Sequence, residues 1–180
     1  MLSSINKKGK IHNIVIVGSS GFAKEVYIII KAINQVKKTW NFIGFIDNNN
    51  LDQGVVHGYK VIGNDEYVRN IGDISVVFGV SEPALKRKIV KYYSANSRIN
   101  YPNIIHPSFL YDEEGVQMGI GNIIAANVVM TTSIQIGDFN IFNINTVVAH
   151  DSVISNYVSI NPKSNISGNV KIGDDCIIGA

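Results

Sequence analysis

Two adjacent residues of the 180-residue sequence, His150 and Asp151, could act together as a general base. An imidazole exchanges protons near neutral pH, and a neighbouring carboxylate stabilises its protonated form. His150 stands two positions after Val148 in the repeat described below, and an inward position there would have required an apolar residue, which predicts that the pair is displayed at a corner. A lone surface histidine is more often inert than catalytic, so the surrounding fold has to decide between the two interpretations.

A second group of residues, the G-x-x-G sequence at 18–21, has the composition of a phosphate-binding loop. It follows an apolar β-branched run at 13–17 and precedes a helical pattern at 22–36. A strand, a glycine turn and a helix open a nucleotide-binding βαβ unit, and Asp47, after the expected strand 42–46, would hold a ribose hydroxyl. The missing middle glycine of G-x-G-x-x-G favours a ligand smaller than a dinucleotide, unless the glycines only permit a tight turn.

The remaining histidines and the cysteine predict no metal site and no covalent catalysis. A zinc site needs three ligands, whereas only His106, at the entrance of the repeat described below, accompanies His150. We expect His106 to close the end of that repeat, and His12 and His57 to be solvated in a terminal segment and a loop. Cys176 has no disulfide partner, and its position in the repeat predicts a partly or wholly buried thiol.

His150 belongs to a six-residue repeat that extends from residue 118 to residue 180. Each sixth residue is apolar, without exception: Met118, Ile124, Met130, Ile136, Phe142, Val148, Ile154, Ile160, Ile166, Ile172 and Ile178. Such a period is typical of a parallel β-helix, with three hexads per coil. We expect the apolar residues to point inward. The short residue after each should form the corner, where Gly or Asn tolerates positive φ.

The first hundred residues predict a small parallel, doubly wound sheet, because strand and helix patterns alternate. Further elements are expected as a strand at 59–62, a helical turn at 65–70, a strand at 74–80 and a helix ending near 93. Ser81 is the expected N-cap of that last helix. Residues 48–58 are expected as a loop and 108–117 as an irregular first coil. The predicted domains are therefore a Rossmann-like unit at 1–102 and a β-helix at 103–180.

The composition describes a globular protein: 46% of the residues are hydrophobic, 17% are charged and the net charge is +2. No basic cluster indicates nucleic acid, and no apolar run reaches the length of a membrane span. A single cysteine and no evident signal peptide predict a soluble, cytoplasmic protein in a reducing compartment.

Five segments of the sequence carry a resemblance to a known family. They are residues 18–24, 44–47, 105–108, 148–151 and 167–173. In this order they resemble the sialic-acid and nucleotide-aminosugar O/N-acetyltransferases, the NeuD/PglD-like hexapeptide-repeat acyltransferases. The resemblance extends from about residue 13 to the end of the chain. The repeat alone would indicate only a broad superfamily, but its union with an N-terminal nucleotide-binding unit is more specific.

This resemblance implies a left-handed β-helix that forms a homotrimer with active sites between subunits. It also implies acetyl-CoA as co-substrate, no metal, and direct transfer of the acetyl group without a covalent intermediate. His150 would deprotonate the amine or hydroxyl of a sugar, and Asp151 would raise its basicity. The implied substrate-binding residues are Ser20, Gly21, Phe22, Asp47, Asn48 and Gly79. The implied coenzyme-binding residues are Ser159, Gly168 and Ala180.

Three features depart from the family pattern. Phe22 and Ser159 stand where relatives often carry histidine, and the sequence stops at Ala180 inside a coil where relatives continue. The leading prediction is an acetyl-CoA-dependent acetyltransferase of a nucleotide-linked amino sugar or sialic-acid-like sugar in surface-glycan biosynthesis. The alternative is a non-catalytic nucleotide-sugar-binding or trimeric assembly protein with a truncated solenoid. A third interpretation, a metal enzyme on the same solenoid, would require bound zinc.

Overall fold

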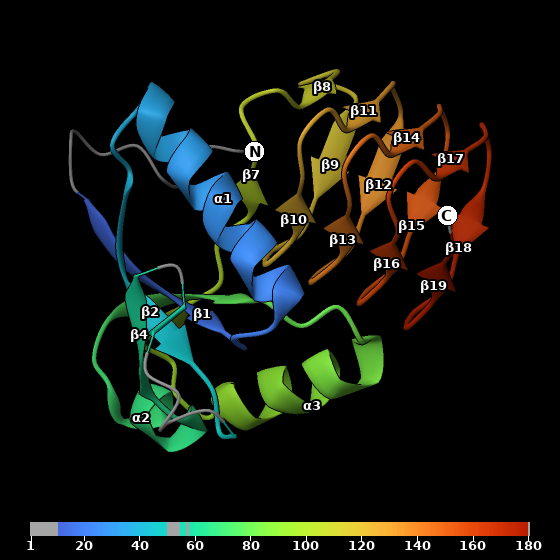
Figure 1. Cartoon of the computed structure of the whole chain (residues 1–180). Helices are drawn as coiled ribbons and strands as arrows, with labels where there is room; N and C mark the ends of the chain where they lie inside the picture. Colours follow the sequence, from blue (N-terminus) through green and yellow to red (C-terminus); the bar gives the residue numbers. More distant parts are fainter. Residues whose placement is uncertain (1–10, 50–54, 57, 180) are drawn as a thin grey trace.

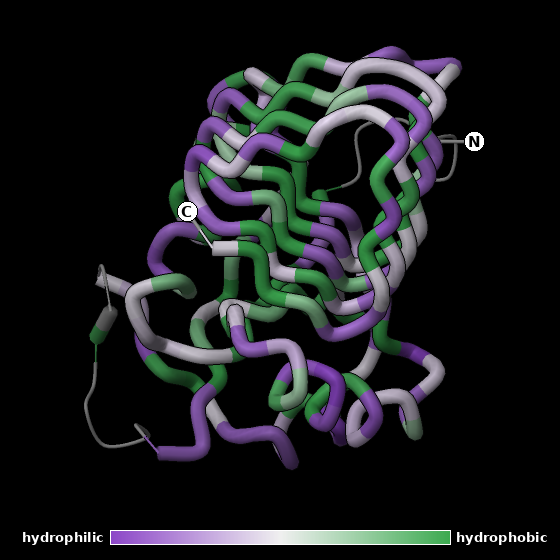
Figure 2. The backbone as a smooth tube through the Cα atoms, turned by 90° about the vertical axis from the view of Figure 1, so that its right-hand side faces the viewer, coloured by the Kyte–Doolittle hydropathy of each residue, from purple (hydrophilic) through white to green (hydrophobic). Residues whose placement is uncertain are grey.

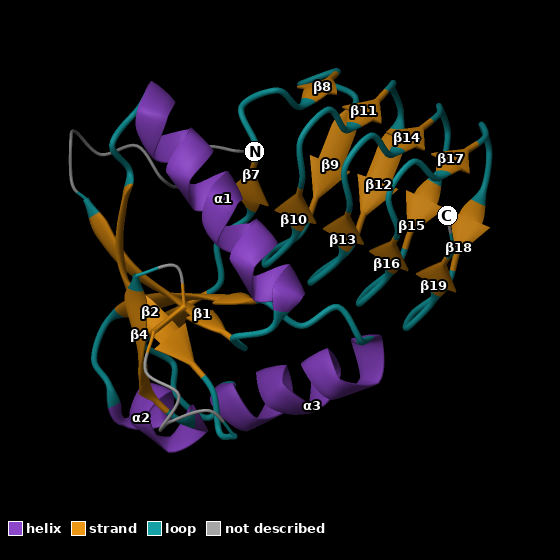
Figure 3. Cartoon of the chain, viewed as in Figure 1, coloured by secondary structure: helices purple, strands orange, loops and turns teal. Residues whose placement is uncertain are grey.

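The computed structural model describes residues 11–49, 55–56 and 58–179, which form two units in contact (Figure 1). The first is a mixed sheet with helices on both of its faces, and the second is a stack of short parallel strands (Figure 3). Two residues named above, His57 and Ala180, lie outside the described residues.

The N-terminal sheet has six strands in the order β3-β4-β2-β1-β5-β6, and only β3 is antiparallel to its neighbour. The strands are β1 (His12–Val17), β2 (Trp40–Ile46), β3 (Val55–Val56), β4 (Tyr59–Gly63), β5 (Ile74–Phe78) and β6 (Ile99–Asn100). The helices are α1 (Gly21–Val36), α2 (Asp65–Asn70) and α3 (Pro83–Tyr93). The prediction of a loop at 48–58 was wrong for Val55 and Val56, which form β3. Two residues are too few to show the alternation of a strand in the sequence.

Apolar clusters fill both faces of this sheet, which confirms the doubly wound arrangement. Ile14 and Ile16 pack toward α1, whereas Val15 and Val17 pack toward α2 and α3. Strands that are covered on both faces read as continuous apolar runs, which explains the β-branched sequence of β1. His12, expected in a solvated terminal segment, instead begins β1 and lies half-buried with its ring 6.1 Å from that of Trp40.

Helix α3 begins at Pro83, but its N-cap is Glu82 and not Ser81 as predicted. The Glu82 carboxylate accepts the N–H groups of Ala84 at 3.1 Å and Leu85 at 2.5 Å. Pro83 fits the first helical position because the N–H that it lacks would have no intrahelical acceptor there. Ser81 is therefore left in the connection that precedes the helix.

The C-terminal unit is a parallel β-helix whose coils stack along three sheets (Figure 2). One sheet contains β7 (Ile104–Ile105), β10 (Ile123–Ile124), β13 (Ile141–Phe142), β16 (Ser159–Ile160) and β19 (Ile177–Ile178). The second contains β8 (Leu110–Tyr111), β11 (Val129–Met130), β14 (Val147–Val148) and β17 (Asn165–Ile166). The third contains β9 (Val116–Met118), β12 (Ile134–Ile136), β15 (Val153–Ile154) and β18 (Lys171–Ile172). Since β8 and the first two residues of β9 fall in 108–117, the prediction of an irregular first coil was wrong.

The inward direction of the sixth residues is confirmed. Ile124, Phe142 and Val148 are fully buried, and the same core contains the other members of the series. Cys176 is half-buried against this core, as its register predicted.

The predicted site of positive φ was wrong, because the left-handed residue is the third after the apolar one and not the first. The non-glycine residues with positive φ are Asn127, Ser133, Phe139, Asn145, Asp151, Tyr157, Lys163, Asn169 and Asp175. Seven of their N–H groups donate to carbonyls of the preceding coil, as in the 2.8 Å bond from Phe139 to Ile120 and the 2.9 Å bond from Tyr157 to Asp138. The Asn127 N–H donates instead to the Ser108 hydroxyl oxygen at 2.8 Å. These bonds offset the cost of the left-handed conformation, about 1–2 kcal/mol for a residue with a Cβ.

Two asparagines that the sequence reading passed over form a ladder inside the β-helix. Asn122 and Asn140 are fully buried. The Asn122 side chain accepts the N–H of Asn140 at 2.9 Å, and the Asn140 side chain accepts that of Val158 at 2.7 Å. Buried amides need such partners, so the ladder fixes the register between successive coils.

The N-terminal unit packs against the sheet that contains β7, which we call the docked sheet. Ile104, Ile123 and Ile141 of the docked sheet share an apolar cluster with buried residues of α1 (Figure 1). The predicted domain boundary at residues 102 and 103 falls in the connection between β6 and β7.

Helix α3 contacts the adjacent corner of the β-helix. The Lys86 ammonium is only 1% exposed and donates to the Phe139 carbonyl at 2.8 Å. This burial lowers the pKa of Lys86 to about 7. The next residue of α3, Arg87, forms ion pairs with Asp174 at 3.1 Å and Asp175 at 2.9 Å. In the part of the chain that the structure describes, no helix is both long and apolar enough to cross a membrane.

Candidate active site

His150 and Asp151 lie at the corner between β14 and β15 and are exposed there. Nδ1 of His150 is 2.7 Å from Oδ2 of Asp151, and the side chains are 61% and 60% exposed. Asp151 adopts φ 59°, and its N–H donates to the Thr132 carbonyl of the preceding coil at 3.2 Å. The corner position therefore places a carboxylate next to the imidazole, and a main-chain bond to the preceding coil holds that corner.

The hydrogen bond to Asp151 assigns different roles to the two nitrogens of His150. An ionised carboxylate can only accept hydrogen bonds, so Nδ1 carries the proton and Nε2 has a free lone pair. An imidazole held in this tautomer can accept a proton at Nε2 while the carboxylate stabilises the imidazolium that results.

Gly168 lies directly against the His150 ring, one coil further along the chain. A Cβ at Gly168 would lie 2.7 Å from both Cε1 and Nε2 of His150, so the ring occupies the space of the absent side chain. Within residues 11–49, 55–56 and 58–179, the Gly168 N–H donates to no acceptor. The structure thus brings a histidine, a carboxylate and an available backbone donor together at one corner.

Replacing Gly168 by alanine is expected to lower kcat about 10- to 100-fold, because the added methyl group must displace the exposed imidazole. Gly168 has no positive φ, so the backbone tolerates alanine and the coil remains folded. Steady-state kinetics and the melting temperature of both proteins test this. Gly173→Ala is the matched control from the same coil, since a Cβ there has no neighbour within 4 Å. Equal kinetics for the two variants would contradict the steric role of Gly168.

The glycine loop, the end of β2 and the end of β5 meet at the carboxyl edge of the N-terminal sheet. Gly18 donates to the Ile46 carbonyl at 2.7 Å, and the Ser19 hydroxyl donates to Asp47 at 2.5 Å. Gly18 adopts φ +97°, and a Cβ on it would lie 3.1 Å from the Gly79 carbonyl oxygen. Only glycine suits this close approach in the left-handed region.

The first turn of α1 is open at this edge. Ser20 is the N-cap of α1 but makes no side-chain capping hydrogen bond. Gly21 is exposed, and a Cβ on it would meet nothing within 4 Å. Unpaired N–H groups of a helix N-terminus attract anions, and here they lie beside Ser20 and Asp47.

Asn48 and Phe22, two further predicted substrate-binding residues, make structural contacts. The Asn48 amide donates to Asp65 at 2.7 Å and accepts the Asp65 N–H at 3.0 Å. The Tyr93 hydroxyl also donates to Asp65, at 2.6 Å, and burial together with this bond raises the Tyr93 pKa. Phe22 is half-buried against the cluster between α1 and the sheet. The sequence reading missed Asp65, which links β2, α2 and α3.

Ser159, a predicted coenzyme-binding residue, is only 3% exposed. Its hydroxyl donates to the Ser81 carbonyl at 2.6 Å, across the contact between the two units.

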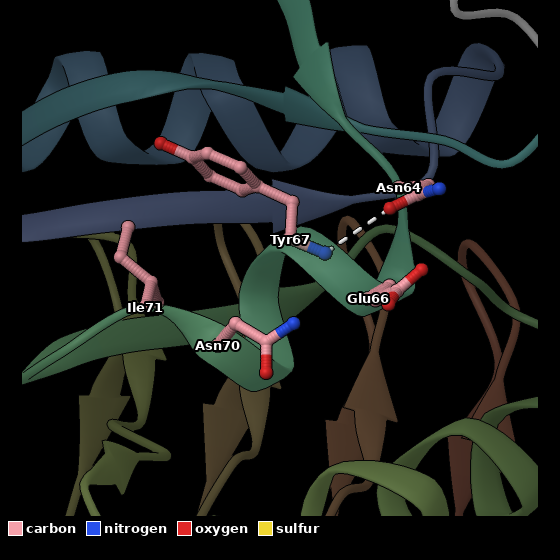
Figure 4. A pocket seen from close by; sticks show the side chains of 5 residues that line it. All are labelled: Asn64, Glu66, Tyr67, Asn70 and Ile71. Atoms are coloured by element: carbon pink, nitrogen blue, oxygen red, sulfur yellow. Dashed lines mark hydrogen bonds between the residues drawn. The ribbon is translucent and has the colours of Figure 1, made fainter.

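A shallow surface hollow on α2 contains none of the predicted site residues (Figure 4). It is lined by Asn64, Glu66, Tyr67, Asn70 and Ile71. The Asn64 side chain accepts the Tyr67 N–H at 3.1 Å and caps α2, so it serves the helix.

One chain does not bring its glycine loop to its own His150. The N-terminal unit covers the docked sheet and the corner at Phe139, whereas His150 lies at the corner between the other two sheets (Figure 1). The body of the β-helix therefore separates the two candidate subsites. Among the described residues, no cluster of three or more His, Cys, Asp or Glu side chains could hold a metal ion.

Comparison with known proteins places these features in a family. Residues 13–93 match the family model of the PglD N-terminal domain, which spans the glycine loop, Asp47 and Gly79. The chain is also similar to the GDP-perosamine N-acetyltransferase of Escherichia coli O157:H7, with 26% identity over 171 residues. That alignment covers 92% of this chain and 74% of the relative. These matches support the resemblance to the NeuD/PglD-like family.

Solved structures confirm the predicted fold class, a Rossmann-like domain followed by a left-handed parallel β-helix. The acetyltransferase domain of PglB from Neisseria gonorrhoeae superimposes with a TM-score of 0.85 at 25% identity, covering 94% of this chain and 80% of that one. Its complex with acetyl coenzyme A gives the same TM-score at 24% identity, covering 95% and 80%. A mutant perosamine N-acetyltransferase from Caulobacter crescentus, in complex with CoA and GDP-perosamine, gives 0.80 at 24% identity, covering 93% and 77%.

Proposed function

We propose that the protein is an acetyl-CoA-dependent acetyltransferase that acts on a nucleotide-linked amino sugar for surface-glycan biosynthesis in the cytoplasm. The observation that carries this proposal is the exposed His150–Asp151 pair, with Nε2 free and the Gly168 backbone against the ring. Two relatives named as perosamine N-acetyltransferases, one of them solved with CoA and GDP-perosamine, support the sugar substrate. The PglB acetyltransferase domain solved with acetyl coenzyme A supports the co-substrate.

In the proposed reaction His150 acts as the general base. Nε2 removes a proton from the sugar amine as the nitrogen attacks the thioester carbonyl of acetyl-CoA, and Asp151 stabilises the imidazolium. A C–N bond forms and the C–S bond breaks. The coenzyme A thiolate then takes the proton from the imidazolium and leaves as the thiol. The Gly168 N–H is available to donate to the carbonyl oxygen where negative charge develops.

The N-terminal unit would bind the nucleotide part of the substrate. Its phosphates suit the open first turn of α1 at Ser20, Gly21 and Phe22, where N–H groups and the helix dipole favour anions. Asp47 would bind a ribose hydroxyl at the carboxyl end of β2, and Gly79 would line the opposite side of the loop. Asn48 would complete the site through its contact with Asp65.

A homotrimer with active sites between subunits would unite the two subsites. The glycine loop and His150 lie on different sides of the β-helix, so a sugar held by one subunit would be acetylated at the corner of its neighbour. In this proposal the thioester would approach His150 beside Gly168, where a Cβ would lie 2.7 Å from Nε2. The family resemblance also implies Ser159 and Ala180 for the coenzyme site. The Ser159 hydroxyl is engaged by the Ser81 carbonyl, so we leave Ser159 out of that site, and Ala180 lies outside the described residues.

The test is release of coenzyme A thiol from acetyl-CoA with a panel of nucleotide-linked 4-amino sugars and free sialic acid. Turnover with one amino sugar, and none with its 4-hydroxy analogue, is the expected result. Light scattering of the same sample should give three times the mass of one chain. If a nucleotide sugar binds but no acceptor releases thiol, the protein is instead a nucleotide-sugar-binding protein and the enzymatic proposal is wrong.

A further inference from the structure

Ser159 interrupts an apolar row on the docked sheet. The strand registers align Ile104, Ile123, Ile141, Ser159 and Ile177 in successive coils. The first three are buried in the apolar cluster that includes α1, whereas Ser159 is nearly as buried but polar. A hydroxyl in such a place requires a hydrogen-bond partner, and the Ser81 carbonyl provides it at 2.6 Å.

The partner of Ser159 belongs to the connection between β5 and α3, residues 79–82. This connection begins at Gly79, whose N–H donates to the Val17 carbonyl at 2.7 Å. The Gly79 carbonyl lies against Gly18 of the glycine loop. Only Val80 separates Ser81 from Gly79, so a shift of Ser81 would move the edge of the glycine loop.

The elements on either side of the 79–82 connection are held in place, so the contact of Ser159 acts on the connection itself. Before it, β5 is a fully buried strand. After it, Lys86 and Arg87 attach α3 to the β-helix. The first intrahelical hydrogen bond of α3 runs from the Lys86 N–H to the Glu82 carbonyl. The Ser81 carbonyl, one residue earlier, is therefore not an acceptor within the helix. The Ser159 hydroxyl therefore satisfies an acceptor that the helix does not use.

We propose that Ser159 is a positioning residue for the nucleotide-sugar site: from the β-helix it holds the 79–82 connection against the glycine loop. The effect on nucleotide-sugar binding rests on the proposed function, whereas the anchoring of the 79–82 connection does not. It differs from a coenzyme contact, because the hydroxyl is directed at a backbone carbonyl of the N-terminal unit.

The experiment compares Ser159→Ala with Ser164→Ala. Ser164 is a second buried serine of the β-helix, whose hydroxyl donates within that unit to Asn161 at 2.9 Å and Gly179 at 2.7 Å. Ser159→Ala leaves a buried carbonyl without its donor, so hydrogen exchange of residues 79–86 in the free protein should become faster. Ser164→Ala should leave exchange in that segment unchanged.

Kinetics then separate the proposed role from a coenzyme contact. Ser159→Ala should raise KM for the nucleotide sugar about 10-fold and leave KM for acetyl-CoA within about 2-fold, since only the nucleotide loop loses support. Unchanged exchange at 79–86, or a rise confined to KM for acetyl-CoA, overturns the proposal. If wild-type protein transfers no acetyl group, the proposed function is wrong, and hydrogen exchange alone decides whether Ser159 anchors the connection.

Discussion

Replacing His150 by alanine is expected to lower kcat by about 10²- to 10⁴-fold, the usual contribution of a general base. The fold should persist, because the side chain is 61% exposed and its hydrogen bond is to the adjacent Asp151. Thiol release with the best acceptor measures the rate. The melting temperature and the oligomeric mass of the variant measure integrity, and both should match those of the wild type.

His106→Ala is the matched control for this loss. His106 also lies in the β-helix, after β7, and its Nδ1 accepts the Ser108 N–H at 3.1 Å. Burial lowers the pKa of His106, and its Nδ1 lies 2.8 Å from the Ser108 hydroxyl oxygen in the same loop. His106 therefore takes no part in the proposed chemistry. Its variant should keep turnover within about 2-fold. Near-normal turnover in His150→Ala would show that the displayed pair does not act as the base.

Gly79→Ala is expected to cost about 1–3 kcal/mol of unfolding free energy, the range found for an overpacked core. A Cβ at Gly79 would lie 2.5 Å from the Cβ and 2.6 Å from the Cα of Ala23 in α1. Neither atom can rotate away, so the helix itself has to move. For a chain of this size the melting temperature should fall by roughly 2–12 °C, measured by calorimetry.

Gly21→Ala is the control for that loss of stability. Gly21 begins α1 with no positive φ, and a Cβ there would meet nothing within 4 Å. Alanine restricts the unfolded chain more than glycine does, so stability should stay unchanged or rise by about 0.4–1 kcal/mol. A similar fall in both variants would mean that the loss at Gly79 comes from the loop in general and not from contact with Ala23.

The sequence predicted best what depends on local pattern. The six-residue period identified the inward residues, because burial of every sixth side chain is repeated in each strand. The exposed corner of His150 followed from the same period. Gly168 could have been matched to His150 by arithmetic, since three hexads per coil place residue 168 next to residue 150.

The sequence predicted poorly what depends on contacts between distant residues. Positive φ falls on Phe139 and Tyr157, aromatic residues that rarely adopt it, because main-chain bonds to the preceding coil impose it. Ser81 and Glu82 are both plausible caps of α3, and a hydroxyl 78 residues away engages the carbonyl of the first. No local pattern records a partner at that separation.

The uniform spacing of the coils has a consequence for how such proteins vary. Equivalent strands pair exactly one coil apart, as Val129 with Val147 and Val147 with Asn165. Deleting one whole coil below His150 would keep every corner and every inward residue in phase. It would, however, move His150 and Asp151 along the β-helix axis toward the N-terminal unit by one strand spacing, about 4.8 Å. The number of coils before His150 therefore sets the height at which the acceptor must be presented, and a family member could change its reach by gaining or losing eighteen residues.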